Sequence, residues 1–491
     1  MPMFYSALML TGVNLLLRMV STSFQVYLSG QIGAAGIGLL QLVLSVGSLA
    51  MTAGMGGIRT ACMYLTAEEL GRRRPGNVVW VLSGAFTYSL VFSGIVASGL
   101  YLFAPWLCEH WIGDLQALEA VRLFAAFLPV CCLSGVMVGY FTAANRIGML
   151  AAVEVLEQAV TMAITLGALH FWARNDPGRA CMAVVAGSGF GGCLTLVCLV
   201  LLRCRERRQI DRRLPVFSRL RQTALPLALA DDLKAGISTA ENLMVPKRLA
   251  LYQGIGSPLA VFGTVCGMVF PVLMFPACIL FGLTELLIPE LARCNAAGSH
   301  FRIRYLVRRG LRVALLYGAI CGGILYLCSD ALCMGLYRNP EAGKYLGWFS
   351  ILTAMLYCDI VTDAMIKGLG QQKISVRYNI LTSLMDLVFL FLLLPRYGIA
   401  GYFFSFAVTH AVNFALSLRR LLKITGQRIP LHVPVLALSS AVAAVGIVSI
   451  LSNPWGKSAA FLALFFSFMV LFGIVTKEEL HWLRGVIKAG R

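Results

Sequence analysis

Residues 220–248, LRQTALPLALADDLKAGISTAENLMVPKR, form a stretch long enough to cross a bilayer in a chain that is 59% hydrophobic. The stretch nevertheless carries four ionisable side chains away from its ends: Asp231, Asp232, Lys234 and Glu241. Because an ionisable side chain at membrane depth is costly, it normally faces the interior of a helix bundle or a water-filled cavity. The fold and the function both depend on what these groups face.

The polar residues of this stretch repeat with the period of a helix. Spacings of three or four residues place one set of them on a single face: Asp231, Lys234, Ser238 and either Glu241 or Asn242. Two interpretations are open. Asp231 and Lys234 form an internal ion pair that only holds helices together, or the whole face lines a cavity used by a substrate or a coupling ion.

The composition predicts an all-α polytopic membrane protein. Only 13% of the 491 residues are charged, whereas soluble domains carry roughly 25%, and the mean hydropathy is +0.80. The net charge of +19 comes from Lys and Arg in short loops, which indicates membrane topology and not a nucleic-acid partner. The 15 cysteines lie mostly in apolar spans and the 6 histidines are scattered, so we expect no metal site and no cofactor.

Hydropathy predicts about fourteen transmembrane helices of about 20 residues each. Lys and Arg concentrate in alternate loops, and this bias places both termini in the cytoplasm of a cell whose plasma membrane the chain spans. A basic segment divides the chain, and we expect it to lie near anionic membrane lipid. The predicted parts are a six-helix lobe (1–202), a cytoplasmic linker (203–220), a second six-helix lobe (221–425), and two extra helices with a cytoplasmic tail (426–491).

The two lobes are predicted to be parallel repeats. One offset aligns the Ile-Gly pair at Ile32 with the pair at Ile255 and places Arg18 opposite Glu241. The second helix of each lobe contains helix-breaking residues: Gly54, Gly56 and Gly57 in the first lobe, and Pro271 and Pro276 in the second. Breaks at corresponding positions of two repeats point to hinges beside a binding site; the alternative is that Gly and Pro are simply frequent in membrane helices.

Other polar groups also fall within predicted spans. Asn14, Arg18, Ser21 and Gln25 share one face of the first helix, where we expect Arg18 to be buried at the depth of Glu241 and able to pair with it across the lobes. Arg59 either snorkels to the cytoplasmic surface or faces a cavity. Each of the further carboxylates either belongs to a structural ion pair or binds a cation or a proton. They are Glu154, Glu157, Asp359, Asp363 (four residues before Lys367) and Asp386.

The chain contains none of the common catalytic motifs, and we predict that it is not an enzyme. The most specific stretch spans residues 224–292, with Pro226 after the start of a helix, a Val-Pro turn at Pro246, and Leu-Ile-Pro-Glu ending at Glu290. With a weaker match over residues 18–68, it resembles the polysaccharide-transporter branch of the multidrug/oligosaccharidyl-lipid/polysaccharide exporter superfamily. The cluster of Asp231, Asp232 and Lys234 departs from that pattern.

The resemblance implies a flippase that moves a lipid-linked oligosaccharide or peptidoglycan precursor, carried on a polyprenyl diphosphate, by alternating access of two lobes. Arginine suits a diphosphate because its planar fork donates two hydrogen bonds. The expected substrate contacts are Arg18, Arg59 and Arg248 with Asn14, Gln25 and Asn242. The expected coupling sites, for Na⁺ or H⁺, are Asp231, Asp232, Lys234, Glu241, Asp359, Asp363 and Asp386.

Two other functions remain open at this point. A cation-coupled exporter of drugs or metabolites on the same fold would use Asp231, Glu241 or Asp359 for the cation and would need no phosphate-binding arginine. A membrane-embedded glycosyltransferase would need catalytic carboxylates on sizeable interfacial loops, and the loops of this chain are short.

Overall fold

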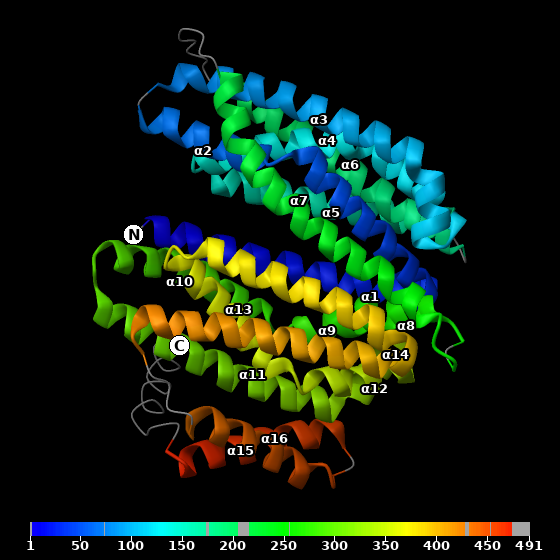
Figure 1. The fold of residues 1–491 in the computed structure, drawn as a ribbon, viewed down its shortest axis with the longest axis vertical. Coiled ribbons are helices and arrows are strands. Elements are labelled where there is room, and N and C mark those ends of the chain that lie inside the picture. Colours follow the sequence, from blue (N-terminus) through cyan, green and yellow to red (C-terminus); the bar gives the residue numbers. More distant parts are fainter. Residues whose placement is uncertain are drawn as a thin grey trace. The chain divides into compact units, whose positions relative to one another are not determined.

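A computed structural model describes residues 2–72, 74–172, 176–204, 216–254, 256–427, 432–451 and 453–473 (Figure 1). Every regular element within these ranges is a helix. The chain divides into two compact units. Unit 1 comprises Met1–Gly267 with Asp386–Gly401, and unit 2 comprises Met268–Met385 with Tyr402–Arg491.

Unit 1 contains eight α-helices and several short helical turns. The α-helices are α1 (Pro2–Met55), α2 (Ile58–Gly71), α3 (Val78–Leu107), α4 (Leu118–Ala143), α5 (Ile147–Phe171), α6 (Pro177–Cys204), α7 (Val216–Leu249) and α8 (Pro258–Phe262). The 3₁₀ turns are η1 (Pro75–Asn77) and η3 (Leu115–Ala117), and the π-helical segments are η2 (Cys108–Ile112) and η4 (Gly263–Val269).

Unit 2 contains the remaining helices. They are α9 (Phe270–Met274), α10 (Cys278–Ala296), α11 (His300–Tyr337), α12 (Pro340–Ser350), α13 (Thr353–Gly368), most of α14 (Gln372–Thr425), α15 (His432–Val448) and α16 (Pro454–Leu471). Phe461 and Phe465 of α16 are fully buried with Ala437 and Ala444 of α15 against α11, as Figure 1 shows for the three helices. The two extra helices therefore belong to unit 2 by apolar packing.

Breaks within the longest helices define the individual spans. Gly33 in α1 has φ 69° and Gly398 in α14 has φ 57°, so each of these helices consists of two segments joined by a glycine in the left-handed region. The segment that ends with α9 is bent by 61° from α10, and α12 is bent by 59° from α13. When the second segment of α1 is joined to α2, and α8–α10 and α12–α13 are each counted as one bent span, the described residues contain 14 helical spans, which confirms the predicted fold class.

Length and apolar composition alone give a smaller number of membrane-spanning helices. In the described ranges, seven helices pass as membrane spans, or up to nine when each bent pair is one span. The difference has local causes. Helices α1 and α14 each count once although a glycine divides them. Helix α7 carries many ionisable residues, and the apolar stretches of α15 and α16 are shorter than those of the counted helices. The chain is a multi-pass membrane protein by either count.

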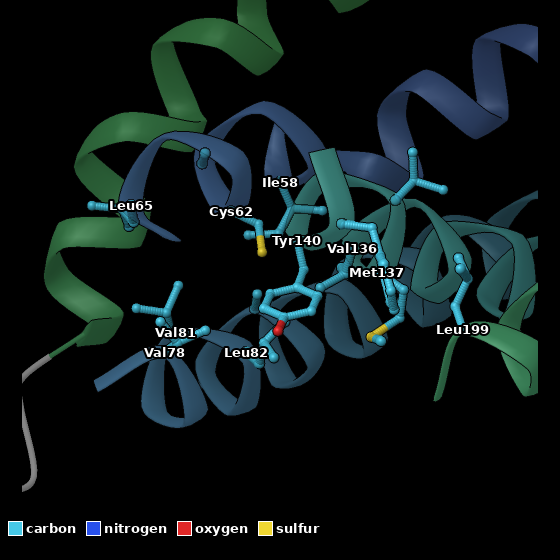
Figure 2. Close-up of a cluster of buried hydrophobic side chains, with 14 of the residues drawn as sticks. Ile58, Cys62, Leu65, Val78, Val81, Leu82, Val136, Met137, Tyr140 and Leu199 are labelled. Carbon is cyan, nitrogen blue, oxygen red and sulfur yellow. The ribbon is translucent and has the colours of Figure 1, made fainter. Parts of the chain in front are cut away.

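The core of unit 1 includes a cluster of buried side chains from α2, α3, α4, α6 and α7 around Tyr140, shown in Figure 2. Directly before α2, Gly57 approaches α7 so closely that an added Cβ atom would lie 2.4 Å from the carbonyl oxygen of Ala224, a member of this cluster. The contacts group α7 with the first six helices, although the internal repeat assigns it to the second lobe. The lobe boundaries that follow from the repeat stay a prediction.

Candidate functional site

A polar cavity of about 570 Å³ lies within unit 1 between α1, α2 and α7. Helix α1 contributes amide and hydroxyl groups from Gln41, Ser45, Ser48 and Thr52. The predicted face of α7 lies opposite, with Asp231, Lys234, Ser238 and Asn242 all lining the cavity. Of the two alternatives for the last residue of this face, Asn242 lines the cavity and Glu241 does not.

The two other acidic residues of α7 point elsewhere. Asp232 and Glu241 are partly buried and are not part of the cavity wall. One carboxylate oxygen of Asp232, Oδ1, is buried and accepts no hydrogen bond from the described residues. By the helical period they lie at the two margins of the lining face, Asp232 beside Thr239 and Glu241 beside Lys234, so periodicity alone does not exclude them from the cavity wall.

The cavity holds three exposed ionisable side chains: Arg59, Asp231 and Lys234. Within the part of the chain that the structure describes, Asp231 and Lys234 form neither an ion pair nor a hydrogen bond, with each other or with a third residue. The structure thus does not contain the internal Asp231–Lys234 pair that one interpretation of the sequence required. Arg59 lies at the cavity, and it likewise makes no ion pair within the described residues.

Hydrogen bonds between α1 and α7 hold one wall of the cavity. Asn242 Nδ2 donates to Ser45 Oγ at 2.9 Å, and Ser45 Oγ donates in turn to the Gln41 carbonyl at 2.8 Å. Thr239 Oγ1 donates to the Ser45 carbonyl at 3.0 Å. Asn242, expected as a substrate contact, therefore also fixes the position of α7 against α1.

A helix break positions the arginine at the cavity. Helix α1 ends at Met55, Gly56 and Gly57 have φ 47° and 68°, and α2 begins at Ile58. The Tyr88 hydroxyl donates to the Gly56 carbonyl at 3.3 Å. The turn places Arg59 in the first turn of α2, so the predicted break adjoins the cavity. Gly54 lies just before it, where an added Cβ atom would come within 2.8 Å of Leu128 Cδ2.

The corresponding break in unit 2 is also present. Pro271 lies in α9, and Pro276 lies between α9 and α10, where the chain bends by 61°. Two tyrosines satisfy carbonyl groups that the break releases from helical hydrogen bonding: Tyr317 donates to Pro276 at 2.8 Å, and Tyr357 donates to Leu273 at 2.9 Å. Whether either break acts as a hinge stays a prediction.

A second cavity of about 310 Å³ adjoins the first at Arg59. Glu154 and Glu157 of α5 line it, as does Thr195 of α6, whose hydroxyl donates to Glu157 Oε2 at 2.6 Å. The sequence indicated the acidic face of α5 but missed Thr195, because nothing in a helical period shows which residue of another helix lies opposite.

Known proteins resemble the chain in sequence and in fold. No family model matches the chain. Stage V sporulation protein B of Bacillus subtilis (strain 168) is 23% identical over 499 residues, which cover 96% of this chain and 96% of that protein. The solved structure of the lipid II flippase MurJ in an inward closed conformation has a TM-score of 0.70 at 10% identity, and covers 95% of this chain and 98% of its own.

The chain has the fold of transporters of the MOP superfamily. An inward-facing multidrug resistance MATE family transporter of that superfamily has a TM-score of 0.66 at 14% identity, covering 85% of this chain and 100% of its own. Both solved structures are of membrane transport proteins, a multidrug transporter and a flippase, and the chain shares their fold. Its similarity to stage V sporulation protein B extends over nearly the whole chain.

Several residues expected at the substrate site lie outside the polar cavity. Arg18 is exposed, whereas we expected it to be buried. The reason is that the first segment of α1 packs little within unit 1, since Leu16, Met19 and Val20 beside it are also exposed. The side chain of Asn14 is outside the described residues.

Gln25 and Arg248 have partners of their own. Gln25 Nε2 donates to the Gly267 carbonyl of η4 at 3.1 Å. The Arg248 guanidinium carbon lies 3.4 Å from the ring centroid of Phe391 in the unit 1 part of α14. Neither side chain lines the polar cavity.

The remaining carboxylates lie on α13 and α14. Asp359 accepts a hydrogen bond from Asn413 Nδ2 at 3.1 Å, and Asp363 pairs with Lys367 Nζ at 2.5 Å and accepts a hydrogen bond from Ser375. Asp363 thus has a structural ion pair. Asp386 is partly buried. Among the described residues, no group of three or more His, Cys, Asp or Glu side chains could hold a metal ion.

Proposed function

We propose that this transporter translocates a polyprenyl-diphosphate-linked oligosaccharide or peptidoglycan precursor for cell-wall, spore-cortex or polysaccharide biosynthesis. The observation that supports this most is the pair of exposed cationic side chains, Arg59 and Lys234, on one polar cavity of a membrane-spanning unit. Although Glu154 in the adjoining cavity attracts Arg59 electrostatically, neither cation forms an ion pair with a described residue. A cation at membrane depth without such a partner favours an anionic ligand.

The chemistry of the cavity suits the polar part of such a lipid. Arg59 offers a planar fork of donors for a phosphate, and Lys234 adds a second positive charge. Hydroxyl and amide groups of Ser48, Thr52 and Asn242 line the same space, and they match the hydroxyl groups of a sugar. Asp231 lowers the net charge of the cavity without cancelling it. The apolar tail of the substrate would remain in the bilayer.

The descriptions of two similar proteins agree with this proposal. The structural relative MurJ is described as a lipid II flippase, and the sequence relative is named for sporulation. We extend the first description to this chain because the cavity carries the charge that a diphosphate requires. Arg18 and Arg248 would contact the substrate before or after it occupies the cavity, since neither lines it.

Alternating access requires that the lobes move, and the broken helices are the proposed hinges. Gly54, Gly56 and Gly57 would serve the first lobe, and Pro271 and Pro276 the second. Asp359 and Asp386 are the proposed sites for a coupling Na⁺ or H⁺. Both termini would be cytoplasmic in the plasma membrane; probes at Gly113 and Asn339 should then react from outside, and one at Gln209, outside the described residues, should not.

A second candidate is a cation-coupled exporter of drugs or metabolites. It is favoured by the exposed carboxylate of Asp231 in the cavity and by the fold similarity to a multidrug resistance transporter. A cationic drug would pair with Asp231, but the cavity also presents Arg59 and Lys234, which repel such a compound. The lipid-linked substrate is therefore the better match to the charge.

The experiment that distinguishes the two is depletion of the protein followed by mass analysis of lipid-linked precursors. We expect a polyprenyl-diphosphate sugar to accumulate on depletion while the efflux of cationic dyes is unchanged. Unchanged precursor levels with lost dye efflux would favour the second candidate.

A further inference from the structure

A groove of about 300 Å³ lies on unit 1 where α3 begins and α6 ends. It is formed by α3, α4 and α6, and none of its lining residues belongs to the polar cavity. Leu82, Phe86 and Met137 make its walls apolar, while the last turn of α6 contributes Arg203. The groove is thus apolar along α3 and cationic at the end of α6.

Apolar side chains of the groove pack against the core of unit 1. Leu82 and Met137 belong to the buried cluster around Tyr140 and Leu199, and Figure 2 shows these four side chains together. Such close-packed side chains give the groove a fixed shape. From Val79 to Phe86, α3 rises about 10 Å, which suits a stretch of acyl chain better than a compact solute.

The cationic end of the groove is Arg203, which packs on an aromatic ring and begins a basic stretch of sequence. The Arg203 guanidinium carbon lies 4.9 Å from the ring centroid of Tyr140, so the ring helps to orient the planar group. Residues 203–221 contain eight arginines against only two acidic residues, Glu206 and Asp211. The sequence that begins at Arg203 is therefore strongly basic.

We propose that this groove binds an anionic phospholipid of the surrounding bilayer. An acyl chain lies along α3 and α4, and the headgroup phosphate meets Arg203. Arginine binds phosphate through paired hydrogen bonds, and basic residues near a membrane surface attract anionic lipid. A zwitterionic lipid would fill the apolar part equally but would gain little from the charge. The site does not depend on which substrate the transporter carries.

The test measures the thermal unfolding of the purified full chain in detergent, with phosphatidylglycerol or phosphatidylcholine added. Phosphatidylglycerol should raise the midpoint by roughly 2–4 °C, because a ligand that binds only the folded state stabilises it. Phosphatidylcholine should have less than half of this effect. Arg203→Gln should lose the difference between the two lipids.

Two further variants separate the groove from the general positive charge of the linker. Val200→Trp fills the groove and leaves every arginine in place, so it should also lose the response to phosphatidylglycerol. Arg179→Gln is the matched control: Arg179 lies at the opposite end of the same helix, with its guanidinium carbon 5.8 Å from the Trp172 ring centroid. It should respond as the natural chain does.

Three outcomes would overturn the proposal. They are an equal shift with phosphatidylcholine, a full response to phosphatidylglycerol in Val200→Trp, and displacement of bound phosphatidylglycerol by an equimolar polyprenyl diphosphate. If Arg203→Gln does not fold, the lipid retained by Val200→Trp and by Arg179→Gln in native mass spectrometry decides the question. The proposal requires retention only in the second of these variants.

Discussion

At the scale of single residues, the polar cavity depends on side chains that are far apart in the chain. Arg59 follows a glycine turn near the N-terminus, while Asp231 and Lys234 lie in the middle of α7. Their positions follow from the helical period and from the hydrogen bonds that join α7 to α1 at Ser45. The same contacts shape the cavity and stabilise unit 1.

The Ser45–Asn242 hydrogen bond provides a residue-scale prediction. Ser45→Ala and Asn242→Ala should each lower stability, and a double-mutant cycle should give a coupling free energy of about 0.5–1.5 kcal/mol, the usual range for polar contacts between membrane helices. The Thr239 hydrogen bond is an internal control, since its acceptor is the Ser45 main-chain carbonyl and survives both changes. Thermal unfolding in detergent measures the effect, and strictly additive effects would contradict the bond.

Sequence patterns predicted the face of α7 but not its surroundings. A spacing of three and four residues places Asp231, Lys234, Ser238 and Asn242 together wherever the helix lies. It does not show that the opposite wall comes from Ser45 and Ser48, nor that Gln25 bonds to the Gly267 carbonyl. Arg18 was expected to be buried for the same reason: periodicity shows a polar face but not what covers it.

At the scale of elements, the break between α1 and α2 joins the cavity to α7. Gly57 has φ 68°, and an added Cβ atom would lie 2.4 Å from the Ala224 carbonyl oxygen and 2.9 Å from the Ala228 nitrogen. Both the backbone conformation and the space therefore require glycine. This contact brings α2 against α7, and with it Arg59 towards Asp231 and Lys234.

Gly57→Ala should therefore destabilise the protein. The left-handed conformation alone costs an alanine about 1–2 kcal/mol, and the contact with α7 adds to this. Gly94→Ala is the control, because Gly94 is an interior residue of α3 with nothing within 4 Å of the added Cβ atom; it should gain up to about 1 kcal/mol. Thermal unfolding of the two variants checks this, and equal midpoints would show that the break tolerates a side chain.

Helix breaks were predictable only where the sequence carries a glycine or a proline. The turns at Gly56–Gly57 and Pro271–Pro276 have such residues, and both are present. The 59° bend between α12 and α13 falls at Ile351 and Leu352, where neither residue type occurs, so hydropathy predicted one continuous helix. The π-helical segment η4 contains Gly263 and Gly267, yet this segment was not predicted from the sequence.

At the scale of the whole molecule, hydropathy was sufficient for the number and type of the helices, because each span must bury about 20 residues in lipid. It was insufficient for the packing of α7. An internal repeat assigns α7 to the second lobe, while tight contacts at Gly57 and hydrogen bonds at Ser45 group it with the first helices. Repeats describe the order of elements along the chain, whereas compact units follow from side-chain contacts.

The central claim is that the cavity moves an anionic lipid-linked sugar across the membrane. The most direct measurement follows translocation of a labelled polyprenyl-diphosphate sugar by the purified chain in vesicles, detected by access of an impermeant reagent to the label. The natural chain should translocate it. Arg72→Gln should do so equally, since Arg72 follows the end of α2, pairs with Glu68 at 2.7 Å and does not line the cavity.

Arg59→Gln should slow translocation by about ten- to a hundredfold, the loss expected from removing a charge-assisted hydrogen bond of about 1.5–3 kcal/mol. Insertion and thermal stability of this variant should stay close to those of Arg72→Gln, because Arg59 is exposed to the cavity and forms no ion pair within the described residues. Translocation by Arg59→Gln at the rate of Arg72→Gln, or none by the natural chain, would contradict the account.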